Sequence, residues 1–363
     1  MRTRIWSFLL CLASAPPAFG DGVEITVLPK NPLVEAGRNE QRVNFELLLQ
    51  NTTREPLELS SLEMSVLAPD GSLVAQRRLG QNGESIATVP SRQLAPGARV
   101  VVFNPFSAFE REVPLDRLRF ELVFDAKDAP GKARAEVTVS PRPHAAKNRL
   151  RLPVRGRVFV HDGHDLLSHH RRLDVTGGMT TALGITTNFM RYAYDFCVVD
   201  EKGRMFRGDG ERNEDWYGFG SPIHAPAAGT VVEAVGDVPD NTKGKPVPLD
   251  REAVMKNVKR IGGNYVVLDH GGGEFSYLAH MKQGSVTVRA GDRVAAGQKI
   301  GAMGMSGDAF LVHLHYQLQS DGHLGEGLPS AFDGLKLYRG KGWTPLKDGS
   351  IDSGDVVESA ATP

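Results

Sequence analysis

The residues best suited to chemistry in this chain lie between positions 195 and 315. His313 and His315 alternate with Leu314 and Tyr316 in the run 312–318, a pattern typical of a strand. Because side chains two residues apart in a strand share a face, both imidazoles point the same way. One imidazole can bind Zn²⁺ through a nitrogen while its neighbour holds or relays a proton near neutral pH.

Asp195 and His280 are two further residues with chemical potential. Asp195 interrupts the apolar run 191–196, where a buried carboxylate is costly unless it meets a cation or hydrogen-bond donors. It is therefore either one partner of a structural ion pair or a metal ligand. His280 stands at the far end of a hairpin, which we expect from two strand-like runs around the glycine turn 271–273.

The order of several short blocks is more informative than any single block. From the N-terminus these blocks are Tyr192-Ala193-Tyr194-Asp195, Ala225-Pro226-Ala227-Ala228-Gly229-Thr230-Val231, Gly263-Asn264-Tyr265-Val266-Val267, Tyr277-Leu278-Ala279-His280, Gly297-Gln298-Lys299-Ile300-Gly301, Gly304-Met305-Ser306-Gly307 and His313-Leu314-His315. Residues 190–320 thereby resemble the catalytic domain of the lysostaphin/LytM peptidoglycan hydrolases. The resemblance implies a small β-sheet domain with one Zn²⁺, whose substrates are peptide bonds in the stem or cross-bridge of peptidoglycan.

The resemblance also implies roles for individual residues. Asp195 and His315 match two of the family's zinc ligands, and His280 and His313 match its two catalytic histidines. The family's first ligand is a histidine four residues before the aspartate, and Arg191 stands there in this chain. Arginine has no lone pair to offer a metal, so a substitute ligand is needed.

Three interpretations of this departure stay open. The substitute ligand could be one of four histidines that precede the domain, namely His161, His164, His169 and His170. Cys197, two residues after the aspartate, is a second candidate, although a lone cysteine is usually a buried apolar residue. Alternatively, Arg191 pairs with Asp195 and replaces the metal charge.

The elements that position these residues are predicted to be mostly β. Forty Gly and twenty-two Pro punctuate short alternating runs, which favours many strands joined by turns. We expect an immunoglobulin-like β-sandwich at 21–145, a linker rich in His and Arg at 146–187, the LytM-type β-sheet peptidase domain at 188–340 and a C-terminal tail at 341–363. The sandwich shows no cluster of ligand-type residues, so it is interpreted as a structural or binding module.

Charge and the N-terminus indicate where the protein works. Lys plus Arg and Asp plus Glu both total 43, so no net field favours nucleic acid or an anionic membrane. Residues 1–20 have basic residues, a short apolar run and small residues at the end, the layout of a cleaved signal peptide. We therefore expect a periplasmic or secreted protein without a later membrane span. The mature chain would keep only the Cys197 thiol, so it has no internal disulfide.

Two functions from different classes follow. The first is an exported zinc metalloendopeptidase that cleaves peptide bonds of peptidoglycan and remodels the cell wall. The alternative is a catalytically degenerate LytM-type domain that acts as a cell-wall binding or regulatory module, for which Arg191 is the motivation. Some glycine turns also resemble biotinyl or lipoyl carrier domains, but the run 303–305 offers no lysine for attachment.

Overall fold

The computed structural model describes residues 18–19, 22–80, 91–127, 129–166, 168–347 and 349–359. The predicted signal peptide lies outside these residues apart from positions 18 and 19, so the structure does not bear on it. In the part of the chain that is described, no helix has the length and apolar character needed to cross a bilayer. Strands dominate, as predicted, and the described α-helices are the short segments α1 (Gly178–Ala182) and α2 (Arg251–Lys256).

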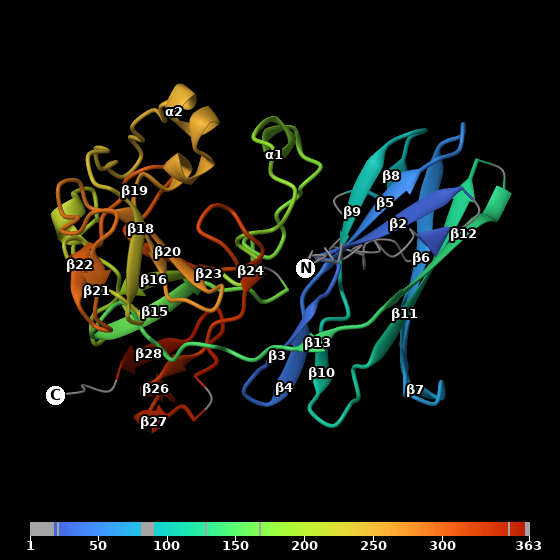
Figure 1. Cartoon of the computed structure of the whole chain (residues 1–363), viewed down its shortest axis with the longest axis horizontal. Coiled ribbons are helices and arrows are strands. Elements are labelled where there is room, and N and C mark those ends of the chain that lie inside the picture. The colour runs from blue at the N-terminus through green and yellow to red at the C-terminus, as the bar shows by residue number, and fades with distance from the viewer. Residues whose placement is uncertain are drawn as a thin grey trace, which may run out of the picture.

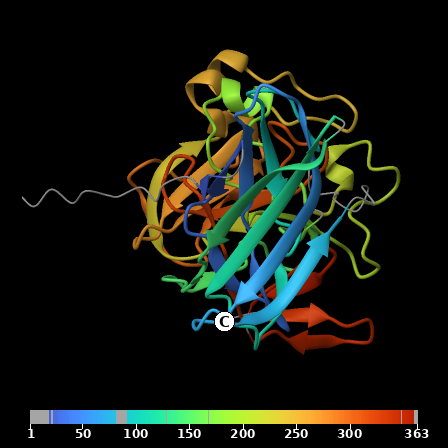
Figure 2. The same cartoon turned by 90° about the vertical axis from the view of Figure 1, so that its right-hand side faces the viewer.

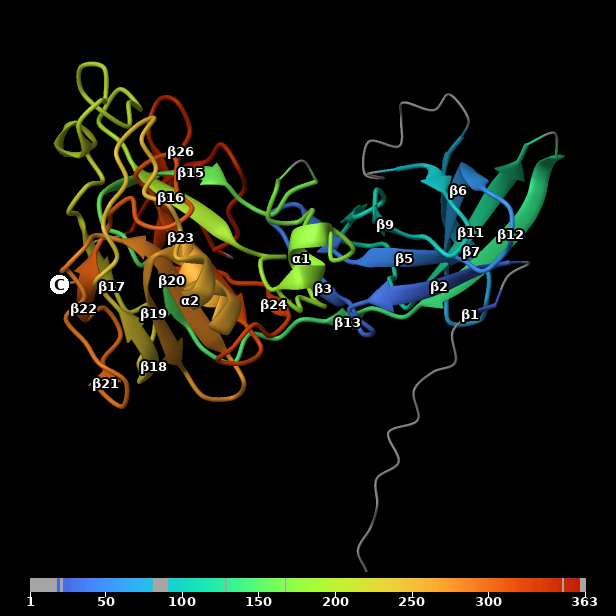
Figure 3. The ribbon, with the colours of Figure 1, turned by 90° about the horizontal axis from the view of Figure 1, so that it is seen from above.

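The first half of the chain forms a set of sheets that we call the N-terminal sandwich, made of the described residues from 18 to 143 (Figures 1 and 3). Its strands are β1 (Ala18–Phe19), β2 (Val23–Leu28), β3 (Leu33–Ala36), β4 (Glu40–Val43), β5 (Glu46–Asn51), β6 (Leu57–Leu67), β7 (Leu73–Leu79), β8 (Gln93–Leu94), β9 (Arg99–Phe103), β10 (Ala108–Glu110), β11 (Arg117–Ala126), β12 (Ala129–Val139) and β13 (Arg142–Pro143). The sheet β1-β2-β5-β9 faces the five-stranded sheet of β12, β11, β6, β7 and β8 across one apolar core.

Sequence alternation explains this packing. Along β11, the buried residues Leu118, Phe120, Leu122 and Phe124 alternate with less buried ones, as a strand with one core-facing side requires. Phe120 meets Phe45 edge to face, with ring centroids 5.5 Å apart, in the middle of the core. A packed pair of sheets is therefore present, while the assignment of this sandwich to the immunoglobulin-like type stays a prediction.

The second half of the chain forms the C-terminal unit, residues 150–359. Its strands are β14 (Leu150–Arg151), β15 (Arg157–Asp162), β16 (Tyr194–Val198), β17 (Pro222–His224), β18 (Gly229–Val235), β19 (Asn264–Asp269), β20 (Phe275–Met281), β21 (Arg293–Val294), β22 (Lys299–Ala302), β23 (Leu314–Gln319), β24 (Gly327–Leu328), β25 (Phe332–Asp333), β26 (Leu335–Tyr338), β27 (Trp343–Pro345) and β28 (Val356–Ser359). Two 3-10 helices, η2 (Asn213–Asp215) and η3 (Val258–Gly262), lie in its loops. An 11-stranded sheet runs in the order β21-β18-β19-β20-β23-β16-β15-β28-β26-β27, with β24 beside β23.

This large sheet extends beyond the predicted limits of the peptidase domain. The hairpin expected around residues 271–273 is present as β19 and β20. In addition, β15 from the predicted linker pairs with β16, and β28 from the predicted tail pairs with β15. Val158 and Val160 of β15 are fully buried in the C-terminal core. Buried and less buried residues therefore alternate along β15, as in an ordinary sheet strand, although polar residues flank it.

A long connection from β15 to β16, which includes α1, lies between the two halves of the molecule (Figures 1 and 3). Figure 2 looks along the long axis, with the N-terminal sandwich in front of the C-terminal unit. Ion pairs join the two halves directly, for example Arg42 of β4 with Asp352 at 2.5 Å.

Candidate metal centre

Backbone pairing brings the predicted site residues Asp195, His280, His313 and His315 together on the large sheet, and adds Asp162, which was not predicted. Asp162 on β15 lies opposite Asp195 on β16, and Asp195 lies opposite His315 on β23. His280 follows the residue of β20 that faces His315, and His313 immediately precedes β23. The sheet therefore assembles residues that are far apart in the sequence.

The Oδ1 atom of Asp195 is the point where three imidazoles meet. His315 Nδ1 lies 3.1 Å from it, His170 Nε2 lies 3.4 Å away and His313 Nε2 lies 3.5 Å away. Burial alone would raise the pKa of Asp195, but positive charge on His170 and His313 and hydrogen bonds from His170 and His315 outweigh burial and hold that pKa well below its usual value, so the carboxylate needs positive charge beside it. The carboxylate is therefore ionised and surrounded by nitrogen.

His170 is the histidine of the predicted linker that reaches the site. Its side chain is buried, with 1% exposed, and its ring centroid lies 4.9 Å from that of His315. The other three histidines of that segment make different contacts: His164 with Glu35, His169 with Asp162, and His161 with the rings of Phe159 and Phe310. Local spacing did not distinguish these four histidines, so the choice of His170 needed the tertiary structure.

Backbone carbonyls define which nitrogen carries the proton in three of the site imidazoles. His170 Nδ1 donates to the Gly163 carbonyl at 3.1 Å, His313 Nδ1 to Leu311 at 2.9 Å and His280 Nδ1 to Ser306 at 2.8 Å. A carbonyl oxygen only accepts, so each Nδ1 must bear hydrogen and each Nε2 keeps its lone pair. Burial also lowers the pKa of all three rings, which favours the neutral form.

A chain of two glutamines orients His315 in the same manner. Gln319 Nε2 donates to the backbone carbonyls of Asp321 and His323, which leaves Gln319 Oε1 to accept from Gln317 Nε2. Gln317 Oε1 then faces His315 Nε2 at 2.9 Å and accepts its hydrogen. The lone pair of His315 is therefore on Nδ1, the atom that faces Asp195. Gln317 continues the alternation of His313 and His315, so period-two spacing alone already placed it on the same face.

The donor set fits a zinc ion. Lone pairs of neutral imidazoles that face an ionised carboxylate repel it unless a cation lies between them. Zinc in proteins is held by imidazole nitrogens and carboxylate oxygens at about 2.0–2.1 Å, so tetrahedral ligand atoms lie about 3.3 Å apart. The 3.1 Å and 3.4 Å separations of His315 and His170 from Asp195 Oδ1 match that spacing.

His280 occupies a strained position beside this group. Among the described non-glycine residues it alone has a positive φ, of 60°. Its ring centroid lies 4.6 Å from that of His313 and 6.0 Å from that of His315. Backbone strain of this kind persists where surrounding structure imposes it, and it is concentrated at functional sites.

Arg191 and Cys197 play no part in the group of imidazoles. Arg191 is fully buried and forms ion pairs with Glu46 of the N-terminal sandwich and with Glu326. Among the described ion pairs none joins Arg191 to Asp195, so the interpretation in which this arginine replaces the metal charge is wrong for this structure. Cys197 lies in the apolar core, and burial raises the pKa of its thiol.

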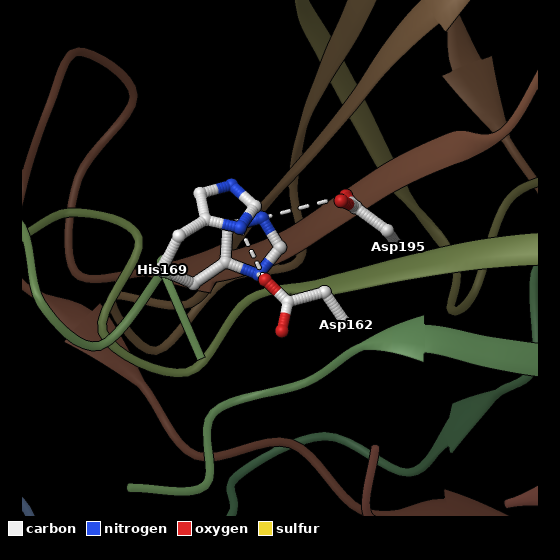
Figure 4. Close-up of side chains that lie close together, drawn as sticks. Asp162, His169 and Asp195 are labelled. Carbon is white, nitrogen blue, oxygen red and sulfur yellow. Dashed lines mark ion pairs between the residues drawn. The ribbon is translucent and has the colours of Figure 1, made fainter. Parts of the chain in front are cut away.

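A second potential donor pair flanks the site. Asp162, His169, His170 and Asp195 each place one ligand-type atom within 4.8 Å of the others. Figure 4 shows His169 beside Asp162, on the side of the group away from Asp195. The hydrogen bond to Asp162 raises the pKa of His169, whose side chain is 62% exposed. His169 is exposed and pairs with Asp162, whereas His315 is buried and its Nδ1 faces Asp195, so His315 is the better ligand candidate.

Comparison with known families assigns part of the C-terminal unit to a family. A family model described as Peptidase family M23 matches residues 216–325, just under a third of the chain. The matched stretch includes His280, His313 and His315, whereas Asp195 and His170 precede it. The chain therefore contains a Peptidase M23 domain, and the resemblance to lysostaphin/LytM-type peptidases is confirmed.

Individual relatives are more distant. Peptidoglycan DD-endopeptidase ShyA of Vibrio cholerae is 36% identical over 69 residues, which cover 19% of this chain and 16% of that protein. The catalytic domain of lysostaphin from Staphylococcus simulans is 21% identical with a TM-score of 0.26, over 48% of this chain and 88% of that one. A mutant catalytic domain of the M23 protein EnpA from Enterococcus faecalis is 20% identical with a TM-score of 0.25, over 38% and 73% of the two chains.

Proposed function

Starting from the Peptidase M23 domain at residues 216–325, we propose that this protein is an exported zinc metalloendopeptidase that cleaves peptide bonds of peptidoglycan. The observation that carries the proposal is the convergence of imidazole lone pairs on the ionised Asp195. His170 Nε2, Asp195 Oδ1 and His315 Nδ1 are the proposed zinc ligands. His170 thereby takes the place of the histidine that Arg191 displaces.

The metal would supply Lewis acidity, lowering the pKa of a bound water to about 7 and polarising the scissile carbonyl. His280 and His313 are the proposed catalytic residues. Both hold hydrogen on Nδ1 through a backbone carbonyl, so each keeps on Nε2 a lone pair that can take a proton. Once protonated, the same atom can donate to the oxyanion or to the leaving amine.

The surroundings of His280 and His313 keep both rings neutral. Burial lowers the pKa of both rings, and the neighbouring imidazoles lower that of His280 further. A neutral imidazole has the lone pair that a general base requires, and the proton affinity of that lone pair falls with the pKa of the ring. The anchored Nδ1 also keeps each ring in one orientation, so little reorganisation accompanies the transfer.

The proposed substrate rests on sequence similarity, and the proposed location rests on the N-terminal sequence. Peptidoglycan is proposed because the resemblance and the name of ShyA both concern peptidoglycan peptides. Periplasmic or secreted location is proposed from the signal-like residues 1–20. The N-terminal sandwich is proposed as a structural or wall-binding part of the same protein.

The decisive experiment measures zinc in the purified chain 21–363 after dialysis against a weak chelator. We expect about one zinc per chain by elemental mass spectrometry, with loss in His170→Ala and in His315→Ala. His323→Ala is a matched control because that side chain is exposed. Zinc-containing protein should release peptides from sacculi, whereas a natural protein without zinc contradicts the proposal.

A second candidate is a non-catalytic wall-binding module. Two observations favour it: Arg191 at a ligand position, and the low exposure of the site, where Asp195, His280, His313 and His315 are all at most 7% exposed. This alternative predicts binding to sacculi without peptide release and without stoichiometric zinc. Stoichiometric zinc with peptide release rules it out.

A further inference from the structure

The segment that carries His170 is held largely by the N-terminal sandwich. Arg171 donates through Nη2 to the Asn104 carbonyl at 2.5 Å and through Nη1 to Ser107 Oγ at 3.2 Å. Both partners lie in the turn between β9 and β10. Arg171 is buried, with 2% exposed, so these contacts replace water completely. The neighbour of the proposed ligand is therefore anchored in the other half of the molecule.

Two further contacts extend this anchorage. At the start of the segment, His164 Nε2 lies 2.9 Å and 3.0 Å from the two carboxylate oxygens of Glu35 on β3. At its end, Val175 packs against the apolar patch of Leu48, Val101 and Phe103. That patch is the outer face of β5 and β9, so the connection covers a face of the N-terminal sheet that would otherwise meet water.

On the other side, the segment is tied to the start of β16. Asn188 Nδ2 donates to the carbonyls of His170 at 3.1 Å and of Arg171 at 3.0 Å. Arg191 follows shortly and pairs with Glu46 on β5. The position at which the resemblance expects a zinc ligand is thus used for an ion pair between the two halves of the molecule.

We infer that the N-terminal sandwich is a positioning part of the metal centre, because it holds the His170 segment against Asp195 through Arg171 and His164. This inference rests on the proposed function, in which His170 binds zinc. It assigns Arg171 as a positioning residue that acts through the adjacent ligand. Separation of the two halves should therefore release the third ligand and weaken zinc binding.

The test compares zinc affinity of full-length variants by competition with a chromophoric chelator. Arg171→Met removes both donors that anchor the His170 segment and should raise the zinc Kd about 10- to 100-fold, a loss of the order seen when an outer group that orients a metal ligand is removed. Ser107→Ala removes one hydrogen bond and should raise the Kd by up to about tenfold. Arg117→Met is the matched control, because Arg117 also donates to backbone carbonyls but within the sandwich.

Two measurements distinguish a positioning role of Arg171 from a general destabilisation of the fold by its replacement. Cobalt(II) bound to Arg171→Met at saturation should keep the visible spectrum of the natural protein, because the ligand set is intact, whereas His170→Ala should change it. Hydrogen exchange of residues 163–172 in metal-free Arg171→Met should be at least about tenfold faster than in the natural protein, while exchange in β11 is unchanged.

Each outcome bears on one claim. Natural affinity in a folded Arg171→Met overturns the inference and leaves the proposed function standing. If Arg171→Met does not fold, Ser107→Ala decides: an unchanged Kd with unchanged exchange at 163–172 overturns the inference. A natural protein without zinc contradicts the proposed function. In that case, unchanged hydrogen exchange at 163–172 in metal-free Arg171→Met also overturns the claim that Arg171 anchors the His170 segment.

Discussion

His315 lies directly opposite Asp195 across the pair of strands β23 and β16, and its Nδ1 is 3.1 Å from Asp195 Oδ1. The antiparallel register therefore brings together two proposed ligands that are 120 residues apart in the chain. His170 and His313 then add their nitrogens to the same oxygen. This arrangement yields predictions about zinc binding, catalysis and stability.

Replacement of His280 should strongly reduce activity without loss of the metal. His280→Ala leaves the three proposed ligands and their hydrogen bonds intact, so about one zinc per chain should be retained. Loss of a general acid or base typically reduces kcat about 10²- to 10⁴-fold. Peptide release from sacculi checks the loss of activity, and elemental zinc content of the same protein checks that the metal is retained. Loss of zinc in this variant would instead place His280 among the ligands.

Replacement of Gln317 should weaken zinc binding although this residue is not a proposed ligand. Gln317 Oε1 accepts the hydrogen of His315 Nε2 at 2.9 Å and so keeps the Nδ1 lone pair toward Asp195. Gln317→Ala should raise the zinc Kd about 10- to 100-fold, as removal of such outer partners generally does. Chelator competition measures the change. An unchanged Kd would show that the tautomer of His315 does not depend on Gln317.

Gly263 supports His280 indirectly. Its φ is +67°, and a Cβ there would lie 2.5 Å from Gly307 N and from the carbonyl carbon of Ser306, whose oxygen accepts from His280. Gly263→Ala should destabilise the fold by about 1–3 kcal/mol from backbone strain alone and should lower kcat while zinc is retained.

Gly244→Ala is the control for this substitution. Gly244 has a φ of +68°, but a Cβ there would meet nothing within 4 Å. It carries the strain of a left-handed residue without the clash. Urea unfolding and kcat should therefore separate the two variants, and equal kcat values would show that the contact with Ser306 has no effect on His280.

Restoration of the family's histidine at position 191 should harm the protein. Arg191 is buried between Glu46 and Glu326, and Arg191→His would leave the buried Glu46 carboxylate without its guanidinium partner. Loss of one partner of a buried ion pair typically costs about 3–5 kcal/mol. Denaturant unfolding of the metal-free protein measures the loss, and the double variant Arg191→Met with Glu46→Gln should recover part of it. Stability equal to that of the natural protein would contradict the role of this pair.

Acid should weaken the contact between the two halves. Burial alone would raise the pKa of Asp352, but hydrogen bonds and charges from Arg42 and Arg38 outweigh burial and lower it. A carboxyl whose folded-state pKa is depressed stabilises the fold fully above its unfolded-state pKa, about 3.9, and loses that contribution as the pH falls through the folded-state pKa. The free energy of unfolding of the natural protein should therefore exceed that of Asp352→Asn at neutral pH, and the difference should shrink below about pH 4.

Asp333→Asn provides the exposed comparison for this pH series. Asp333 pairs with Arg149, whose side chain is 89% exposed, so solvent screens the pair. Its substitution should change the free energy of unfolding little at any pH. A pH-independent difference for Asp352→Asn would contradict the assignment of that carboxylate to an ion pair.

The sequence by itself determined the strands and one face of the site. Period-two alternation is local, so it placed His313 and His315 on one face before any partner strand was known, and the ordered blocks identified the kind of domain. The glycine turn at 271–273 likewise predicted the hairpin that ends at His280. These features depend on interactions between residues that are close in the chain.

Only the tertiary structure decided which histidine is the third proposed zinc ligand and which residues pair with Arg191. Four histidines of the predicted linker were equivalent by spacing, and His170 is selected because Arg171 and Asn188 hold its segment from opposite sides. Arg191 pairs with Glu46, 145 residues away. Such contacts depend on how the two halves of the molecule pack together, and no local pattern in the chain encodes that packing.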